Sequence, residues 1–466
     1  MEIRVPHGYC TLTSPFRESH RLAKGGYMAR GKLKEYDAII VGSGPGGSTV
    51  ARELARAGKK ILILERGRDD QKLGTYRTAL RVLDMGRSKE GLSMLRASTT
   101  GGATVFYSAS AADPPPWLAS RYDIDLSPLL DEIKKETRVN VLPESLLGKA
   151  SLKVMETANK LGYHWEPMAK FLDPERFIQG RCCGANEHLG CTCGAKWTAR
   201  EYLEDAVAAG ADLLTETECE EVVLEGGVAV GVRARGPTRV LGEYRAVRVI
   251  LCAGGLTTPL LLMRTGVREA GDGCFMDPTV VVYGAAPFEG TWADPPVSVV
   301  TWEFDDSDGI RIGTIMEPRL ILGMNLFRQS PRNVALALRY RSVVGILVKV
   351  KDDLSGRVYP DGSVSKQLND NDHARLNKGV EVSKEILRAL GCASKNLVAG
   401  ETKGAHPSGT CRIGHVLSKE LESQIPNLYA CDASVFPEAL DRPTVITIVA
   451  LGKRLARHIL ALEKAA

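Results

Sequence analysis

The chain has 466 residues, 25% of them charged and 44% hydrophobic, and its formal net charge is +5 at pH 7. This length allows two or three domains, and the composition is that of an ordinary globular protein. The small charge gives little support for a nucleic-acid partner, which normally shows clustered basic residues. No run of about 18 apolar residues occurs, which predicts no membrane span, and the apolar stretch of a secretory signal is not expected at the N-terminus.

Cysteine usage indicates the redox compartment. The chain has 11 cysteines, an odd number, and most of them are scattered. A disulfide scaffold is not expected in a chain this long, so the simpler interpretation is a reducing, cytoplasmic compartment.

The first predicted element follows an N-terminal segment, residues 1–35, that lacks hydrophobic periodicity. We expect a surface arm there, with a lid or an arm exchanged between subunits as the alternative. The apolar run Asp37–Val41 predicts a strand buried on both faces. A glycine-rich turn, a helix at Ser48–Ala57 and a second buried strand at Lys60–Leu64 complete a β-turn-α-β unit.

The remaining elements alternate between helix and strand. Helices are predicted at Ala195–Ala209 and Asn371–Leu390, the second capped by Asn371 or Asp372 and ended by Gly391. The other expected elements are a β-meander at Glu220–Leu224, Val228–Arg235 and Arg239–Ala246, a buried strand at Val249–Cys252 followed by a helix with Pro259 near its start, an antiparallel sheet within 275–360, and a strand, turn and helix within 427–460. Nucleotide-type elements thus occur at both ends and in the middle, which predicts one domain built from discontinuous pieces.

The glycine-rich turn carries a dinucleotide fingerprint, Gly42-x-Gly44-x-x-Gly47, between a buried strand and a helix. In this motif Gly42 permits the tight turn, Gly44 lets the backbone approach a pyrophosphate, and Gly47 lets the helix pack against the strand. Glu65 ends the second strand, where a carboxylate accepts hydrogen bonds from ribose hydroxyls and repels a 2′-phosphate. The alternative is a tight glycine turn in an unrelated fold.

Five motifs occur in a fixed order along the chain. They are Val41–Gly47 with Glu65–Gly67, Thr99–Thr104, Ile250–Pro259, His406–Gly414, and Leu428–Pro437 followed by Pro443, Thr444 and Thr447. Over residues 36–460 the sequence resembles the glucose–methanol–choline (GMC) family of flavoenzymes. Each motif is weak alone, whereas five in this order are specific.

The resemblance implies an α/β fold with a Rossmann-like FAD-binding domain that is discontinuous. That domain would comprise 36–115, 195–275 and 403–466, with a cap and cysteine-rich segment at 116–194. A substrate-binding domain at 276–402 would be built on an antiparallel β-sheet with helices. The implied FAD-binding residues are Gly42, Gly44, Pro45, Gly46, Gly47, Glu65, Arg66, Gly101, Gly102, Thr104, Val223, Ala253, Gly254, Asp432, Ala433, Pro443 and Thr444.

The family reaction removes a hydride from a CH–OH group of a small-molecule substrate while a base takes the hydroxyl proton. His406 occupies the family's active-site histidine position, and an imidazole titrates near neutral pH. Without the surrounding motif, a histidine beside a proline would be read as a packed or surface residue. Asp432 is expected to hold the ribityl chain of FAD through its backbone or carboxylate, and His415 is interpreted as structural.

Arg442 departs from the family pattern, which usually has Asn or His before the Pro-Thr pair. A guanidinium stays protonated and cannot act as a base. It can bind a substrate carboxylate or phosphate, or stabilise developing negative charge, so Arg442 is a second candidate catalytic residue. An ion pair with Asp441 or Glu438 is the simplest alternative. A lyase or decarboxylase that keeps FAD is therefore a competing hypothesis.

Four cysteines, Cys182, Cys183, Cys191 and Cys193, fall within a short segment. Four thiolates can hold zinc or an iron–sulfur cluster. Their spacing departs from the common Cys-x2-Cys pattern, and a cysteine-rich loop or a local disulfide is the alternative. If iron and sulfur bind, the third functional hypothesis is a flavin and iron–sulfur electron-transfer protein.

The substrate, the electron acceptor and the oligomeric state are not identified by the sequence. A pocket formed by 275–400 is expected to be open, or closed by a partner subunit. Its candidate lining residues are Trp302, Phe304, Asn325, Phe327, Arg339 and Tyr340.

Overall fold

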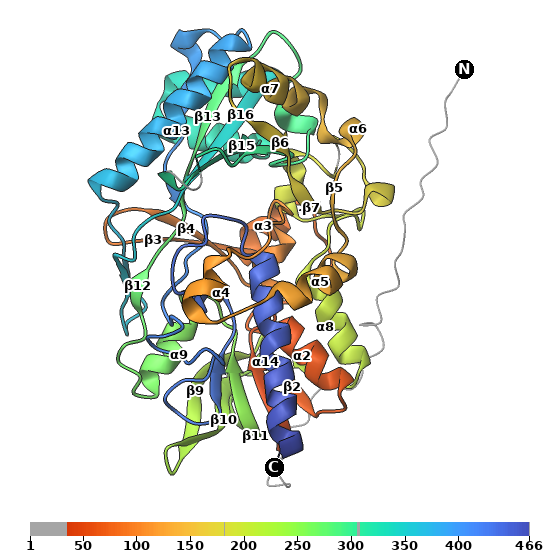
Figure 1. The fold of residues 1–466 in the computed structure, drawn as a ribbon, viewed down its shortest axis with the longest axis vertical. Helices are drawn as coiled ribbons and strands as arrows, with labels where there is room; N and C mark the ends of the chain where they lie inside the picture. The colour runs from red at the N-terminus through yellow and green to blue at the C-terminus, as the bar shows by residue number, and fades with distance from the viewer. Residues whose placement is uncertain (1–34, 181, 305–307, 466) are drawn as a thin grey trace. The chain divides into compact units, whose positions relative to one another are not determined.

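The structure is a computed structural model that describes residues 35–180, 182–304 and 308–465. Two large β-sheets form its framework, one in the lower half and one in the upper half of Figure 1. The expected N-terminal arm lies outside the described residues, apart from Glu35, which begins the first strand.

The first sheet is the predicted Rossmann-like unit. Its parallel part has the order β8-β2-β1-β11, with a further strand, β21, parallel to β11. The bounds are β1 (Glu35–Val41), β2 (Ile61–Leu64), β8 (Asp212–Leu214), β11 (Leu241–Leu251) and β21 (Leu428–Ala430). Strands β10 (Val228–Arg235) and β9 (Glu218–Glu225) continue it as an antiparallel meander. The continuous apolar runs form β1 and β2 because helices and loops cover both sheet faces.

Strand β11 corrects one prediction, since the segments expected as two strands form one. Residues Leu241–Arg245 pair with β10, and Arg245–Leu251 pair with β1. Val247 and Arg248 between them contain no turn signal, so the strand changes partner without interruption. This continuity connects the meander directly to the parallel core.

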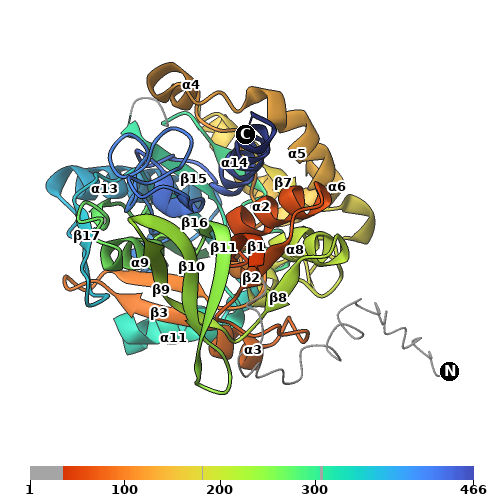
Figure 2. The same cartoon turned by 90° about the horizontal axis from the view of Figure 1, so that it is seen from below.

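Three helices from distant parts of the chain pack together beside the parallel strands (Figure 2). They are α2 (Pro45–Arg56), α8 (Ala199–Ala208) and α14 (Val445–Ala465), with α2 in contact with both others. Helix α8 begins four residues later than predicted, because Lys196 forms a β-bridge with Leu172 and Trp197 N–H donates to the Phe171 carbonyl at 3.0 Å.

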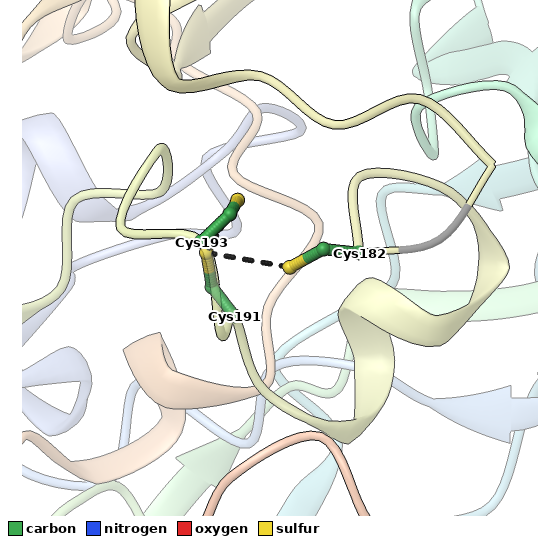
Figure 3. Close-up of side chains that lie close together, drawn as sticks. All are labelled: Cys182, Cys191 and Cys193. Atoms are coloured by element: carbon green, nitrogen blue, oxygen red, sulfur yellow. Dashed lines mark hydrogen bonds between the residues drawn. The ribbon is translucent and has the colours of Figure 1, made fainter. Parts of the chain in front are cut away.

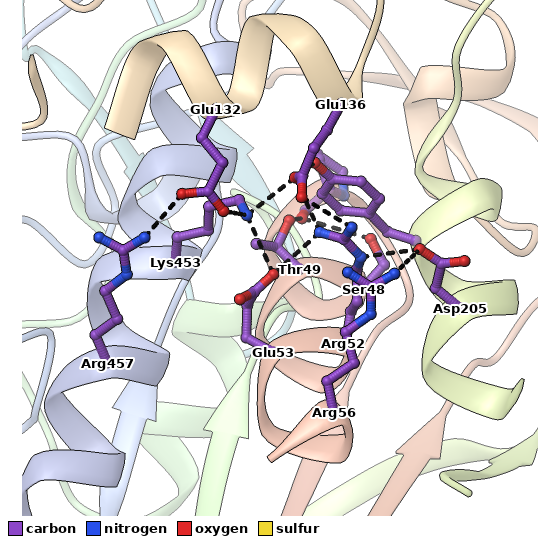
Figure 4. Close-up of polar contacts among 12 residues, drawn as sticks. Ser48, Thr49, Arg52, Glu53, Arg56, Glu132, Glu136, Asp205, Lys453 and Arg457 are labelled. Carbon is purple, nitrogen blue, oxygen red and sulfur yellow. Dashed lines mark hydrogen bonds and ion pairs between the residues drawn. The ribbon is translucent and has the colours of Figure 1, made fainter. Parts of the chain in front are cut away.

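A partly buried network of ion pairs joins these helices to α5 (Leu130–Glu136), as Figure 4 shows. The Arg52 guanidinium, 5% exposed, binds Glu136 at 2.9 Å, and the fully buried Lys453 ammonium lies 2.9 Å from the same carboxylate. Burial alone would raise the pKa of Glu136, but hydrogen bonds from Arg52, Tyr202 and Lys453 outweigh it and lower this pKa to about 2. Glu136 therefore fixes the packing of the helix that begins at the glycine fingerprint.

The second sheet is predominantly antiparallel. Most of its strands come from 276–402, the segment predicted to bind substrate. Its order is β3-β4-β20-β13-β16-β15-β14-β6, with β19 beside β13. The bounds are β3 (Leu83–Arg87), β4 (Ser93–Ala97), β6 (Trp165–Pro167), β13 (Pro278–Ala285), β14 (Val299–Thr301), β15 (Ile310–Thr314), β16 (Val343–Val350), β19 (Val398–Ala399) and β20 (Lys403–Gly404). Helix α13 (Asp370–Ala389) packs on β13, β15 and β16.

Two local predictions in this region need correction. Residues 319–338, expected within a sheet, form α11 (Arg319–Gln329) and α12 (Val334–Leu338), because Leu322 and Leu326 fall one turn apart and bury one helix face. The N-cap of α13 is Asn369, not Asn371 or Asp372. Its side chain accepts from Asp372 N–H at 2.8 Å, and the Asp372 carboxylate accepts from Asn369 N–H at 3.1 Å, which forms a capping box.

The strands of the two sheets do not follow the boundaries of the predicted domain segments. Strands β3 and β4 fall within the predicted FAD-binding piece 36–115, and β6 within the predicted cap, yet all three belong to the second sheet. The two sheets are therefore interleaved along the sequence.

Shorter elements complete the described chain. They are α3 (Tyr76–Val82), α4 (Trp117–Tyr122), α6 (Glu144–Leu147), α7 (Lys149–Lys160), α9 (Thr258–Arg264), β5 (Val139–Val141), β7 (Ala169–Phe171), β12 (Asp272–Cys274), β17 (Gly356–Val358) and β18 (Val364–Ser365). Among the described helices, none has the length and apolar content needed to cross a bilayer.

Replacing Glu136 by Gln is expected to lower the free energy of unfolding by about 3 kcal/mol at pH 7, because Arg52 and Lys453 would lose their shared carboxylate. Chemical denaturation measures this. The lowered pKa means that the stabilisation is complete above the unfolded value of 4.5 and is lost as pH falls toward 2. The difference between wild type and variant should shrink over that window.

The matched control is Glu381→Gln, which removes an exposed pair with Lys384 on α13. It should change the free energy of unfolding by less than about 0.5 kcal/mol. Equal effects of the two substitutions would contradict a special role for the Glu136 network.

Candidate functional site

A cavity of about 500 Å³ contains most of the predicted site residues. Its lining includes the glycine turn after β1, the end of β2, the loop after β11, the segment before α14, and the face of the second sheet. This volume is in the usual range for ligand-binding cavities.

The glycine turn forms one wall of the cavity through Gly42, Gly44, Pro45 and Gly46. Gly42 has φ of 103°, and a Cβ on Gly46 would lie 1.8 Å from the Cys431 carbonyl oxygen, so a side chain fits at neither position. A Cβ on Gly44 would meet no atom within 4 Å. Because α2 begins at Pro45, its first N–H groups lie beside this open space, an arrangement that suits a pyrophosphate.

Glu65 stands at the end of β2, 6% exposed, and lines the cavity. Its carboxylate accepts from Ser43 Oγ at 2.6 Å and from Gly67 N–H at 2.7 Å. Ser43 N–H also donates to it at 3.1 Å, so three bonds orient the carboxylate and one acceptor site, on Oε1, is left for a ribose hydroxyl. Arg66 also lines the cavity, and its Nε donates to Ser98 Oγ at 3.1 Å.

The second motif forms a 3₁₀ turn, η1 (Gly102–Val105), opposite the glycine turn. Gly102 and Thr104 line the cavity. The Thr104 hydroxyl donates to the Gly101 carbonyl at 2.6 Å and accepts from Ala199 N–H at 3.0 Å, so it joins the turn to α8. Gly101 and Gly47 lie in the same turns but are not among the described lining residues.

The Asp432 carboxylate is used within the protein. One oxygen accepts from Gly254 N–H at 2.7 Å and from the Thr258 hydroxyl at 2.6 Å, and the other accepts from Ser434 N–H at 2.8 Å. Asp432 therefore fastens the loop after β11 to the segment after β21. Ala253, Gly254, Asp432, Ala433, Pro443 and Thr444 all line the cavity.

Val223 is a third predicted cofactor residue that the described lining does not include. It lies in the middle of β9. The same region contributes Thr217, Glu218 and Cys219, at the start of the strand. The start of β9 adjoins the end of β2, since Thr217 N–H donates to the Glu65 carbonyl at 2.9 Å.

His406 lies in this cavity beside two residues that the sequence did not single out. Its Nδ1 is 2.9 Å from Asp277 Oδ2, and Lys349 Nζ is 2.6 Å from the same oxygen. Both Asp277, fully buried, and Lys349, 8% exposed, come from the second sheet region. An ionised carboxylate only accepts hydrogen bonds, so Nδ1 carries the proton and Nε2 is left for the cavity.

The charges around His406 favour its neutral form. Burial lowers the pKa of His406, the Lys349 ammonium and the Arg311 guanidinium lower it further, and Asp277 opposes them. Burial alone would raise the pKa of Asp277, but Lys349 and His406 outweigh it and lower this pKa to about 2. The imidazole, 36% exposed into the cavity that it lines, is thus a neutral base beside a fixed anion.

Asp277 has φ of 47°, a left-handed conformation that a side chain rarely adopts. The backbone there is held by Asp352, whose carboxylate accepts from Met276 N–H at 3.0 Å and from Asp277 N–H at 2.9 Å. Lys366 Nζ lies 2.7 Å from Asp352, and both are fully buried. This second ion pair maintains the position from which Asp277 reaches His406.

Arg442 is the second candidate catalytic residue. It is not among the described residues that line the cavity, and its Nε lies 3.3 Å from Asp441 Oδ1, the ion pair considered as the simplest alternative. The lysine and arginine residues that line the described cavity are Arg66, Arg96, Arg311 and Lys349. The Arg311 guanidinium stacks over the Trp302 ring at 3.8 Å and lies 3.9 Å from Asp441.

The cavity has an apolar part on the side of the second sheet. Its lining includes Met168, Val297, Val300, Ile315 and Leu347, with Tyr107, Ser108 and Ser110 as polar groups. None of the six pocket candidates from the sequence is among the described lining residues. Asn325 and Tyr340 instead bond to Glu317, and Phe327 is exposed.

Lys349 and Arg311 could have been found from the sequence. Each is a charged residue within an otherwise apolar strand, β16 and β15, and a buried charge requires a partner. Nothing in the sequence indicates that the partner of Lys349 is Asp277.

The four clustered cysteines are brought together outside the cavity lining. The sulfurs of Cys182, Cys191 and Cys193 lie within 4.8 Å of one another (Figure 3). The sulfur of Cys183 is 3.4 Å from that of Cys193. The 3₁₀ turn η4 (Ala185–Leu189) lies in sequence between Cys183 and Cys191, and its His188 lines the cavity. Burial lowers the pKa of His188 to about 4.

Comparison with known proteins relates the chain to one enzyme family. Two family models, both described as GMC oxidoreductase, match residues 36–281 and 351–452. An uncharacterised protein of Methanocaldococcus jannaschii is 27% identical over 91% of this chain and 100% of its own length. A long-chain-alcohol oxidase of Arabidopsis thaliana is 24% identical over 92% of this chain and 69% of its own.

A solved structure, pyridoxine 4-oxidase from Mesorbium loti, shares the fold with a TM-score of 0.66 and 16% identity. The match covers 91% of this chain and 99% of that one.

Two alanine substitutions separate the roles of neighbouring glycines. Gly44→Ala should leave the unfolding midpoint of the cofactor-free protein unchanged, because φ of −65° suits any residue and the Cβ meets no atom within 4 Å. The methyl group would occupy the space above the α2 N-terminus, so FAD affinity should fall roughly tenfold or more. Gly46→Ala should instead destabilise the fold by about 1–3 kcal/mol through its clash with Cys431.

Thermal unfolding and flavin titration of the cofactor-free protein measure the two effects. Full FAD affinity in the Gly44→Ala variant would mean that the pyrophosphate does not approach this turn.

Proposed function

Because the chain belongs to the GMC oxidoreductase family, we propose that it binds FAD in this cavity and oxidises a CH–OH group of a small molecule, with His406 as the proton acceptor. The observation that carries the proposal is the position of His406. Its imidazole lines the same cavity as the dinucleotide cradle, with Nδ1 bound to Asp277.

The residues fit FAD at both of its ends. The open space at Gly44 and the oriented carboxylate of Glu65 suit the pyrophosphate and an unphosphorylated adenosine ribose. The N-terminal end of α14 brings Pro443 and Thr444 to the cavity near His406. When bound, FAD would supply the hydride acceptor.

The residues of the chain accept and stabilise the proton that the substrate releases. His406 Nε2 takes the proton of the substrate hydroxyl, and the imidazolium that forms is stabilised by the Asp277 carboxylate. Lys349 neutralises that carboxylate and keeps the imidazole uncharged before the reaction. The apolar lining excludes water from the reacting carbon.

The substrate proposed is an alcohol with an apolar body. The side chains of Met168, Val297, Val300, Ile315 and Leu347 line the same cavity as His406. The names of the two characterised relatives, a long-chain-alcohol oxidase and a pyridoxine 4-oxidase, agree with an alcohol donor.

The competing hypothesis of a carboxylate or phosphate substrate rested on Arg442. With that guanidinium paired to Asp441 away from the cavity lining, the hypothesis loses its recognition group. The same holds for the lyase or decarboxylase, which needed Arg442 for its carboxylate. An electron carrier built on an iron–sulfur cluster depends on the cysteines, which are considered below.

His406→Ala is expected to slow flavin reduction about 10²–10⁴-fold while FAD remains bound, because only the proton acceptor is removed. Anaerobic mixing with a panel of primary and secondary alcohols, sugars and hydroxy acids, followed by flavin bleaching, measures the rate. Arg442→Ala is the matched comparison and should retain most activity. Equal reduction rates in wild type and His406→Ala would contradict the assigned role.

The pH profile should shift in opposite directions in two variants. The Lys349 ammonium lowers the pKa of His406, so Lys349→Met should raise that pKa and move the acid limb of kcat/KM to higher pH. Asp277 raises the pKa, so Asp277→Asn should move the acid limb to lower pH. Shifts of the same sign would show that these charges do not control His406.

A further inference from the structure

Four thiols from one irregular segment gather beside the cavity wall. The sulfur of Cys191 lies 3.7 Å from that of Cys182 and 3.5 Å from that of Cys193, and Cys183 is 3.4 Å from Cys193. Bonded sulfurs in a disulfide are about 2.05 Å apart, so these are separate thiols. The reaction proposed above uses none of them.

The sulfurs of Cys182, Cys191 and Cys193 all lie within 4.8 Å of one another, a spacing close to the ligand shell of one metal ion, and Cys183 joins this group through its contact with Cys193. Zinc binds cysteine sulfurs at about 2.3 Å, which sets the edge of a regular tetrahedron of sulfurs at about 3.8 Å. The separations of 3.4, 3.5 and 3.7 Å are close to this edge. In a four-iron cluster each cysteine binds a different iron, so its sulfurs lie farther apart than sulfurs that share one ion.

The surroundings suit a closed structural site. Cys182 and Cys183 are 5% and 1% exposed, and Cys191 and Cys193 are partly buried. Thr192 N–H donates to Cys182 Sγ at 3.1 Å, a bond that stabilises a thiolate. Closed sites with four thiolates and no open position are typical of structural zinc.

We propose that Cys182, Cys183, Cys191 and Cys193 bind a single zinc ion. The ion closes the loop that contains η4, and η4 carries His188 into the cavity wall. The described part of the segment is otherwise held by turn-type backbone bonds, such as Cys183 N–H to the Ile178 carbonyl at 3.0 Å and Gly74 N–H to the Leu189 carbonyl at 2.8 Å. Metal binding would stabilise the fold of this segment, because the free energy of binding a structural metal adds to the free energy of folding.

The zinc loop also supports a second part of the wall. Lys196, just after Cys193, is fully buried and donates to the Tyr107 carbonyl at 3.0 Å and to the Glu187 carbonyl at 3.2 Å. Tyr107 lines the cavity. The ion therefore positions one side of the cavity without taking part in electron transfer, because zinc has no redox chemistry.

The test uses the FAD-containing full-length protein purified without oxygen. Elemental analysis should find about one zinc ion per chain, with no iron and no acid-labile sulfide. Iron with sulfide, iron alone, or no metal with four freely reacting thiols would each overturn the proposal.

Cobalt substitution gives a readout that is independent of catalysis. Co²⁺ among four thiolates should produce intense ligand-field bands at wavelengths longer than the flavin absorption. Cys182→Ser and Cys193→Ser should lose these bands and the bound zinc, and their thermal unfolding midpoint should fall. Cys392→Ala, which removes a buried thiol after α13, is the control and should keep both signals.

Cobalt bands that survive in Cys193→Ser would contradict the ligand set. If the variants fail to fold, weak octahedral-type cobalt bands in the wild-type protein would by themselves overturn it. None of these readouts requires flavin reduction, so failure of the zinc proposal and failure of the proposed oxidation can be distinguished.

Discussion

The carboxylate of Asp277 is fully buried, and a buried negative charge needs a positively charged partner in direct contact with it. Lys349 balances it from β16, and His406 shares the same oxygen from the segment after β20. Three separate parts of the chain are therefore tied at one point. The second pair, Asp352 with Lys366, holds the strained backbone from which Asp277 projects. The position of the base depends on this sequence of buried ion pairs.

The dinucleotide end of the cavity depends on backbone contact instead. At Gly46 the turn touches the Cys431 carbonyl, and at Gly42 it adopts a conformation that favours glycine. Asp432 then fastens the β11 loop to the segment after β21. These contacts bring the N-terminal motif, the middle strand and the C-terminal segment together, which explains why the FAD-side elements are scattered along the sequence.

Local elements were predictable, and long-range pairings were not. Strands β1 and β2 and helix α2 follow from apolar runs and glycines, and α13 follows from its periodicity within one or two residues. The membership of β3 and β4 in the second sheet depends on β20, three hundred residues away in sequence, and no local pattern records it. The apolar content of residues 319–338 favours a strand, whereas the helical spacing of Leu322 and Leu326 agrees with the observed helix.

The site shows the same limit. His406, Glu65 and the glycines are predictable from motifs, because a motif fixes residue types at set spacings along the chain. Arg442 was given a role from its place beside a motif, but neighbours in sequence can point in different directions, and its guanidinium turns to Asp441. Lys349 and Asp277 meet only through folding, although a lysine inside the apolar strand Val343–Val350 was a visible anomaly.

The central claim is that His406 is a neutral base whose Nδ1–H is held by Asp277. Nitrogen NMR of the FAD-bound protein with labelled histidine, assigned by comparison with His406→Gln, tests it most directly. The account predicts the Nδ1-protonated tautomer and a pKa below the usual 6.5. An Nε2-protonated ring, or an imidazolium that persists above pH 6.5, would contradict it.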